Sequence, residues 1–178
     1  PDYLCKPEEV AEAFNELLLS GKIREAGVSN FRPSLLAVLQ KACHNSLIAH
    51  QVEISLAKLD AFDDGTLDQC LSEKMTPLAW SPLGGGVLGT PEKTAGMGPR
   101  HAVSAHLQET IQSIAEARGL SRSVISLAWL LKHPSQIVPI VGSADPERIR
   151  DCAKAAEVDL TRDEWYRLFT AARGERLP

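Results

Sequence analysis

Several features that would identify common classes of protein are missing from this sequence of 178 residues. A membrane-spanning helix needs about 18 or more consecutive apolar residues, and no run of that length occurs. The net charge of −4 and the pI near 5.7 argue against binding to nucleic acid or to a membrane surface, because such proteins usually carry a basic patch. No charged segment followed by an apolar one, as in a signal peptide, opens the chain, so the expected location is cytoplasmic.

Cysteine is scarce, and its four occurrences stand far apart at Cys5, Cys43, Cys70 and Cys152. Without closely spaced pairs they do not resemble a disulfide framework, and the expected state is the reduced thiol of a cytoplasmic protein. No cluster of cysteine and histidine has the short spacing of zinc ligands. The sequence therefore predicts no metal centre.

An obvious catalytic group is missing as well. Acid–base or nucleophilic catalysis needs a reactive side chain and a partner that orients it. The five histidines lie in or beside predicted helices, loops or a strand start, and Tyr3 and Tyr166 lie near the chain ends. We therefore expect no catalytic residue within this sequence.

What the sequence does contain is an alternation of short apolar strands with helices. Strands are predicted to start near Glu25, Leu47, Thr76 and Ile137. Apolar residues at helical spacing predict helices over 7–20, 32–44, 66–74, 103–118 and 121–132, and from 146 and 162 onwards. This alternation indicates an α/β protein with a parallel sheet, and residues 1–178 are interpreted as a single domain.

Three further predictions concern the start of the last helix and two segments between the predicted strands and helices. Thr161 and Glu164 have the spacing of a capping box at the start of the last helix. Residues 55–64 show no regular pattern and are expected to be irregular. Residues 84–101 are rich in glycine and have no periodicity. A loop of this length is usually functional or disordered, and we interpret this one as a mobile flap over the glycine loop.

The stretch over residues 75–86 combines an apolar strand, an aromatic residue and three glycines. Trp80 offers a flat face for stacking, or is simply a core residue. Gly84, Gly85 and Gly86 let the backbone approach a ligand and can present N–H groups to an anion. The order of strand, aromatic and glycine loop suggests a nucleotide site, although an ordinary turn can have the same composition.

Small or polar residues also follow two of the other predicted strands. Ligands bind at the carboxyl ends of parallel strands, which meet at one edge of the sheet. Ser29 and Asn30 could bind an amide or cap the next helix. Gln51, within a strand, could recognise a carboxamide through its donor and acceptor, or could be a structural glutamine.

The turn at Gly142 and Ser143 leads into a helix and has the features of an anion site. Unpaired N–H groups and the positive end of the helix dipole face such a turn. Arg148, inside the helix, could hold a phosphate with its charged fork. The alternative is that Ser143 and Asp145 only cap the helix and that Arg148 is a solvated surface charge.

Four segments resemble the aldo-keto reductase family: 21–31 (GKIREAGVSNF), 49–55 (AHQVEIS), 78–86 (LAWSPLGGG) and 140–149 (IVGSADPERI). In this order they are similar to the fifth, sixth, seventh and eighth strands of that family, with the turns that follow. The similarity is closest to bacterial oxidoreductases. It implies a (β/α)8 barrel that uses NADPH to reduce aldehydes and ketones.

The resemblance also implies which residues contact the cofactor. Ser29, Asn30 and Gln51 correspond to contacts with the nicotinamide carboxamide, and Trp80 to the residue stacked on the nicotinamide ring. The remaining implied contacts are Ser81, Leu83, Gly84, Gly85 and Gly86 with the pyrophosphate, Gly142, Ser143 and Arg148 with the 2′-phosphate and adenosine ribose, and Asp151 with the adenine. Cys152 departs from the family, which often has asparagine there.

The resemblance covers only half of the family's barrel, because the implied catalytic Asp, Tyr, Lys and His belong to the preceding half. The expected fold class is therefore α/β, the parallel-strand half of a TIM (β/α)8 barrel. Four parallel strands leave two open edges, which a homodimer could close. A carbonyl substrate would be reduced only if the missing half were supplied. The alternatives are a non-enzymatic module that docks a partner through its open edges, and a truncated fragment without independent function.

Overall fold

The computed structural model describes residues 1–2, 4–89 and 102–175 and contains a single parallel sheet. Its strands are β1 (Gly27–Ser29), β2 (Ala49–Glu53), β3 (Thr76–Trp80) and β4 (Val138–Pro139). They lie in sequence order β1-β2-β3-β4, and every neighbouring pair is parallel. The α/β class and the parallel sheet predicted from the sequence are confirmed.

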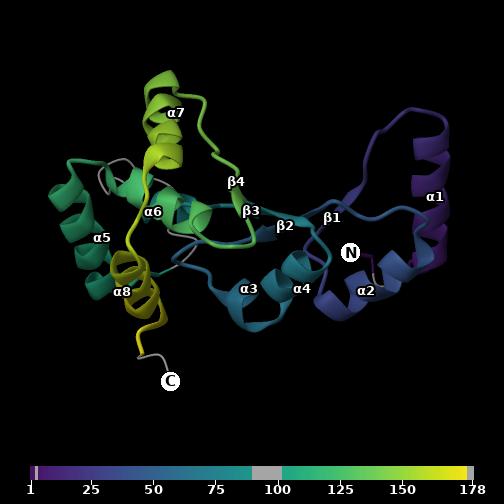
Figure 1. Ribbon diagram of the computed structural model, residues 1–178, viewed down its shortest axis with the longest axis horizontal. Coiled ribbons are helices and arrows are strands. Elements are labelled where there is room, and N and C mark those ends of the chain that lie inside the picture. Colours follow the sequence, from purple (N-terminus) through teal and green to yellow (C-terminus); the bar gives the residue numbers. More distant parts are fainter. Residues whose placement is uncertain (3, 90–101, 176–178) are drawn as a thin grey trace.

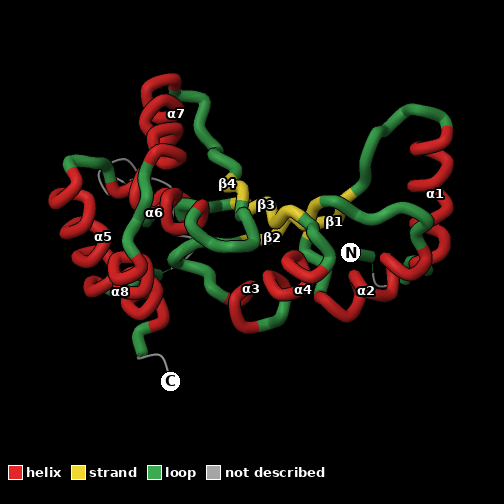
Figure 2. Tube along the Cα trace, in the orientation of Figure 1, coloured by secondary structure: helices red, strands yellow, loops and turns green. Residues whose placement is uncertain are grey.

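Helices precede the first strand, connect the successive strands and come after the last strand in the sequence (Figures 1 and 2). The helix α1 (Pro7–Leu19) precedes β1, α2 (Pro33–Ala42) joins β1 to β2, and α3 (Asp60–Asp63) and α4 (Thr66–Ser72) join β2 to β3. Next, α5 (Ala105–Arg118) and α6 (Arg122–Leu131) join β3 to β4. The chain then continues through α7 (Pro146–Ala153), the 3-10 turn η3 (Lys154–Glu157) and α8 (Arg162–Arg173).

Some predicted boundaries are wrong. The strands β1, β2 and β4 begin at Gly27, Ala49 and Val138, up to two residues later than predicted. The strand β4 is the shortest of the four and, within the described residues, pairs on one side only, with β3. The expectation that 55–64 is irregular is corrected by α3. Residues 90–101 of the predicted flap lie outside the described residues.

The two faces of the sheet differ in burial. Alternate side chains of β2 and β3 are buried on one face, namely those of His50, Val52, Pro77 and Ala79. The residues between them are only partly buried and point to the other face, as expected for side chains that alternate along a strand. In Figure 1, α2, α3 and α4 lie along the lower side of the sheet, whereas α1 and α7 stand at opposite ends of the upper side.

The core is divided into two clusters on the covered side. The smaller one joins α2 to the starts of β2 and β3 through Leu36, Leu39, Leu47, Cys70 and Met75. The larger one joins the sheet to α5, α6 and α8, and its bulkiest fully buried side chain is Trp129. The rings of Trp129 and Trp165 stack at 5.2 Å, and each indole N–H donates to the other residue's carbonyl oxygen.

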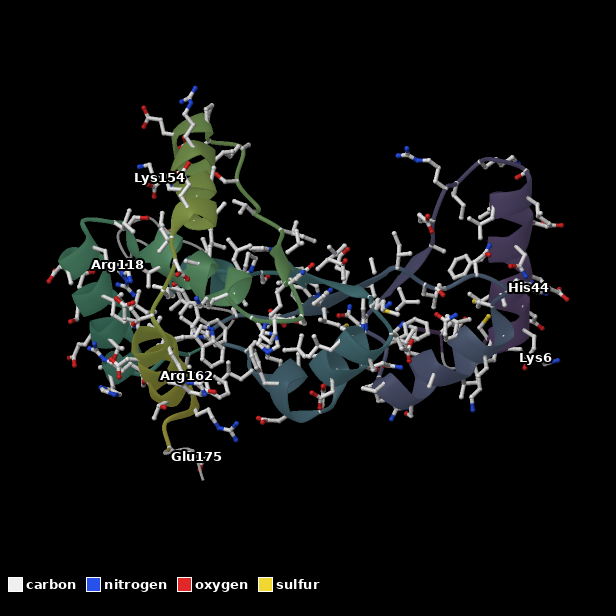
Figure 3. All side chains as sticks on the ribbon, in the orientation of Figure 1. Lys6, His44, Arg118, Lys154, Arg162 and Glu175 are labelled. Carbon is white, nitrogen blue, oxygen red and sulfur yellow. The ribbon has the colours of Figure 1, made fainter. Side chains whose placement is uncertain are left out.

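The start of α8 is fixed by the predicted capping box. The hydroxyl of Thr161 accepts from the Glu164 N–H, and the Glu164 carboxylate accepts from the Thr161 N–H. That carboxylate also accepts two hydrogen bonds from Arg118 on α5, at 2.8 and 2.6 Å. Figure 3 shows Arg118 among the side chains at this end of the molecule. None of the helices in the described residues is long and apolar enough to cross a membrane.

Replacing Glu164 should make the chain less stable at neutral pH and less sensitive to acid. The hydrogen bonds from Arg118 and Thr161 lower the pKa of Glu164 from 4.5 to about 2. The carboxylate therefore stabilises the fold above about pH 4.5, and this contribution is lost as the pH falls towards 2. For this partly buried pair we expect Glu164→Gln to cost about 2 kcal/mol at pH 7.

Urea unfolding at a series of pH values measures this effect, with Glu157→Gln as the control because Glu157 is exposed. The two variants should differ in unfolding free energy at pH 7 and converge in acid. A constant difference across the pH range would contradict the assigned role of Glu164.

Candidate functional site

Polar contacts tie together the carboxyl ends of β1, β2 and β3. The Ser29 hydroxyl and the Asn30 N–H both donate to the carbonyl oxygen of Gln51, at 3.0 and 2.9 Å. The indole N–H of Trp80 donates to Oδ1 of Asn30 at 3.1 Å. Since β2 lies between β1 and β3, this last bond crosses over the end of β2 and fixes the Trp80 ring there.

Two residues at these strand ends have a left-handed backbone. Asn30 has a φ of +56° and Ser81 a φ of +48°. Asparagine adopts this conformation more readily than most residues, whereas serine there is strained. The left-handed turn at Asn30 brings its side chain towards Trp80 directly after β1. The sequence identified Asn30 as a candidate ligand-binding residue but gave no indication that its backbone is left-handed.

Gln51 lies on the uncovered face of the sheet, paired in register with Ser29 and Leu78. Its backbone carbonyl is engaged, but its side-chain carboxamide makes no hydrogen bond with the described part of the chain. A carboxamide with both donor and acceptor available can pair with another carboxamide. The geometry is therefore compatible with the ligand-binding interpretation of Gln51.

His50 supports this site from the opposite face of β2, and sequence reasoning missed it. The ring is fully buried, and its Nε2 accepts a hydrogen bond from the Phe31 N–H at 3.2 Å. Desolvation lowers the pKa of His50, although the charge of Asp64 opposes the shift, so the ring is neutral and carries its proton on Nδ1. His50 thus holds the turn that follows Asn30. In the sequence, the only indication of this role was that His50 directly precedes Gln51 on a strand whose side chains alternate between the two faces of the sheet.

The glycine loop after β3 forms a 3-10 turn, η1 (Gly84–Gly86). All three glycines have positive φ, and a Cβ on Gly84 would lie 3.1 Å from the Ala57 side chain. The N–H groups of Gly84 and Gly86 donate within the turn, to the carbonyls of Ser81 and Leu83. Of the three glycines, only Gly85 has an N–H without a hydrogen bond to the described residues and so left for an anion. The Leu83 side chain packs against the larger core.

The turn before α7 is occupied by its own capping residue. Asp145 accepts from the N–H groups of Glu147 and Arg148 at 2.9 and 3.4 Å, and its own N–H donates to the Ser143 hydroxyl. Nε of Arg148 lies 3.6 Å from the Asp145 carboxylate. The capping interpretation of this turn is therefore present in the structure. At Gly142 an added Cβ would meet nothing within 4 Å, so space remains beside the turn.

Asp151 connects α7 to α6. Its carboxylate accepts from the Ser121 hydroxyl at 2.5 Å and from Lys154 at 2.9 Å (Lys154 is labelled in Figure 3). Partial burial raises the pKa of Asp151, but the hydrogen bonds from Ser121 and Lys154 outweigh it, so the pKa lies below its usual value. The implied contact of Asp151 with adenine remains a prediction. In the described residues, no three metal-ligating side chains gather into a possible metal site.

The left-handed turn at Asn30 can be tested by comparing two substitutions. Asn30→Ala keeps a Cβ and should be strained at φ +56°, whereas Asn30→Gly tolerates that angle. Both variants lose the bond to Trp80. We expect Asn30→Ala to be less stable than Asn30→Gly by about 1 kcal/mol in urea unfolding. Equal unfolding free energies would show that no backbone strain is present at this position.

The sequence model of the aldo/keto reductase family matches residues 1–172 of the chain. A 6-dehydroglucose reductase from Novosphingobium aromaticivorans is 42% identical over 178 residues, which is 100% of this chain and 56% of that protein. Oxidoreductase YdhF of Escherichia coli is 39% identical over 178 residues, covering 100% of this chain and 57% of that protein. The chain thus spans little more than half the length of these relatives.

Solved structures give the same result. The thermostable aldo-keto reductase Tm1743, solved with the inhibitor epalrestat, is 29% identical and superposes with a TM-score of 0.83 over 96% of this chain and 57% of its own. An aldose reductase from Giardia lamblia is 27% identical, with a TM-score of 0.73 over 94% of this chain and 50% of its own. The parallel sheet corresponds to part of the TIM barrel of these enzymes, and the chain belongs to the aldo/keto reductase family.

Proposed function

We propose that this chain is the cofactor-binding half of an NADPH-dependent aldo-keto reductase. In this proposal β1 to β4 take the place of strands five to eight of a (β/α)8 barrel. The order of the four parallel strands supports it, as do the two open edges and the uncovered face of the sheet. The match to little more than half of each relative is a further support.

The observation that carries the proposal is the hydrogen bond between Trp80 and Asn30 beside the available carboxamide of Gln51. Trp80 uses the oxygen of Asn30, which leaves the Asn30 NH₂ to donate to the carbonyl oxygen of a nicotinamide carboxamide. The Ser29 hydroxyl donates to Gln51, which leaves its lone pairs to accept from the nicotinamide NH₂. Gln51 can donate and accept, and the Trp80 ring supplies a fixed stacking surface.

The phosphates of the cofactor would find fewer available hydrogen-bond donors than the nicotinamide does. The Gly85 N–H and the loop from Ser81 to Leu83 would contact the pyrophosphate, together with Gly84 and Gly86 through close backbone approach. Ser143 and Arg148 would reach the 2′-phosphate, with Gly142 leaving room beside it. Because Asp145 already caps this turn, its carboxylate has to release Arg148 when a phosphate arrives.

The reaction itself needs a proton donor that this chain does not position. Bound NADPH supplies the hydride, and a carbonyl substrate then needs an acid near its oxygen. In the described residues, the ends of β1 to β4 hold amides, hydroxyls, an indole and the carboxyl group of Glu53, the last residue of β2, but no tyrosine or histidine side chain that could donate the proton. We therefore propose that an Asp, Tyr, Lys and His from another half-barrel complete the enzyme, and that this chain alone binds the cofactor without appreciable turnover.

Binding of NADPH can be tested by calorimetry and tryptophan fluorescence on the whole chain. We expect saturable binding that quenches Trp80, because the nicotinamide stacks on its ring. Trp80→Phe should remove most of the quenching, since Trp129 and Trp165 are enclosed in the larger core. Gln51→Leu should weaken binding about tenfold, the effect of losing a paired carboxamide.

Gln112→Leu is the matched control, because Gln112 is exposed on α5. Its affinity for NADPH should equal that of the unaltered chain. Failure of the unaltered chain to bind NADPH would overturn the proposed binding. Aldehyde reduction as fast as that of an intact reductase would overturn the proposed lack of turnover.

A second candidate function is self-association through the open edges, and the apolar edge strand favours it. Val138 and Ile140, in and beside β4, are 46% and 39% exposed. Within the described residues the strand pairs only with β3. Unpaired edges of this kind are templates for another strand. Two copies could then close an eight-stranded sheet.

Light scattering after size exclusion should therefore give the mass of a dimer, with or without NADPH. Ile140→Lys should produce a monomer, because the charge would have to be buried at the closed edge. Leu71→Lys serves as control, since Leu71 on α4 is 45% exposed but lies away from the edge strand. A monomeric unaltered chain would exclude this second function.

A further inference from the structure

Arg122 at the start of α6 has two buried guanidinium nitrogens without a partner among the described residues. Its Nε and Nη2 atoms are inaccessible to solvent and make no hydrogen bond with the part of the chain that the structure describes. Desolvation lowers the pKa of its guanidinium. Arg118 and Arg173 differ, because each is paired with a carboxylate. An unpaired buried cation opposes folding unless an anion is supplied, so this arrangement points to a missing negative group.

The surroundings of Arg122 show where that anion would lie. The residue before it, Ser121, donates to Asp151 on α7, and α7 packs on α6 (Figure 1). The residue after it, Ser123, reaches the end of the glycine loop, where a Cβ on Gly89 would lie 2.9 Å from the serine hydroxyl. The first turn of α6 is therefore between the two segments proposed to hold the adenosine and the pyrophosphate.

The Asp151 carboxylate, which contacts the neighbouring Ser121, does not neutralise Arg122. The Asp151 carboxylate is engaged by Ser121 and Lys154 rather than by Arg122. On α7, Arg148 is paired with Asp145 and its side chain is 49% exposed. Of these two cations Arg122 is the one with free, desolvated donors.

We propose that Arg122 binds a phosphate group on the adenosine half of the dinucleotide, a role that rests on the proposed cofactor-binding function. The guanidinium presents planar paired N–H donors that match phosphate oxygens, and burial strengthens such a contact. The bound phosphate neutralises the guanidinium and satisfies its Nε and Nη2 donors. Arg122 is therefore a cofactor-binding residue on α6, in addition to those at the strand ends.

Calorimetry with adenosine 2′,5′-bisphosphate and with ADP tests this contact, because neither probe carries a nicotinamide. Arg122→Met should weaken binding of at least one probe about tenfold or more, and Arg122→Lys should retain part of the affinity. A loss confined to the 2′,5′-bisphosphate assigns the 2′-phosphate, and an equal loss for both probes assigns the 5′ side. Arg150→Met is the control, since Arg150 is exposed on α7.

Thermal unfolding separates this role from a structural one. Without ligand, Arg122→Met should melt at a higher temperature than the unaltered chain, because it removes an unpaired buried charge. With saturating 2′,5′-bisphosphate the order should reverse, since only the unaltered chain gains the full stabilisation of binding.

Two results would overturn the inference. If the unaltered chain binds a probe and Arg122→Met binds it equally well, only the role of Arg122 is excluded. If the unaltered chain binds neither probe nor NADPH, the proposed function is excluded together with it.

Discussion

The structure depends on a parallel sheet that is covered on one face only. Parallel sheets are normally buried on both faces, and here the row of Ser29, Gln51, Leu78 and Val138 runs across all four strands on the uncovered face. This row changes from polar at β1 to apolar at β4. The polar end can therefore bind a ligand, while the apolar end needs another protein surface. Both proposed functions follow from the same uncovered face.

The two ends of the proposed cofactor site differ in how far the chain satisfies its own polar groups. At the nicotinamide end, the internal bonds of Asn30 leave donors and acceptors pointing outwards, so a ligand adds bonds without breaking any. Towards the phosphates and adenosine, Asp145 already uses the N–H groups of Glu147 and Arg148, and the η1 turn uses those of Gly84 and Gly86 but not that of Gly85. A ligand that only replaces one hydrogen bond of the chain by another gains little net free energy of binding. Affinity should therefore come mainly from the nicotinamide end and from Arg122.

The sequence predicted those features that depend on neighbouring residues. The capping box of Thr161 and Glu164 is a three-residue spacing, and the alternation of strands and helices is a local pattern, so both could be identified. The bond between Asn30 and Trp80 joins residues 50 positions apart and depends on the strand order. Burial of Arg122 depends likewise on how α6, α7 and the glycine loop pack, and no pattern in the sequence records that packing.

Arg122 also explains why the adenosine end would be poorly stable without its ligand. Selection for stability alone would replace an unpaired buried guanidinium with an apolar side chain of similar size. Its presence between Ser121 and Ser123, beside a carboxylate that is engaged elsewhere, is instead consistent with a charge kept for binding. Nε of Arg148, in contrast, already lies 3.6 Å from the Asp145 carboxylate, and this contact has to be given up before Arg148 can hold a phosphate. Arg122 therefore has more to gain from a bound phosphate than Arg148, because two of its guanidinium nitrogens are already removed from water.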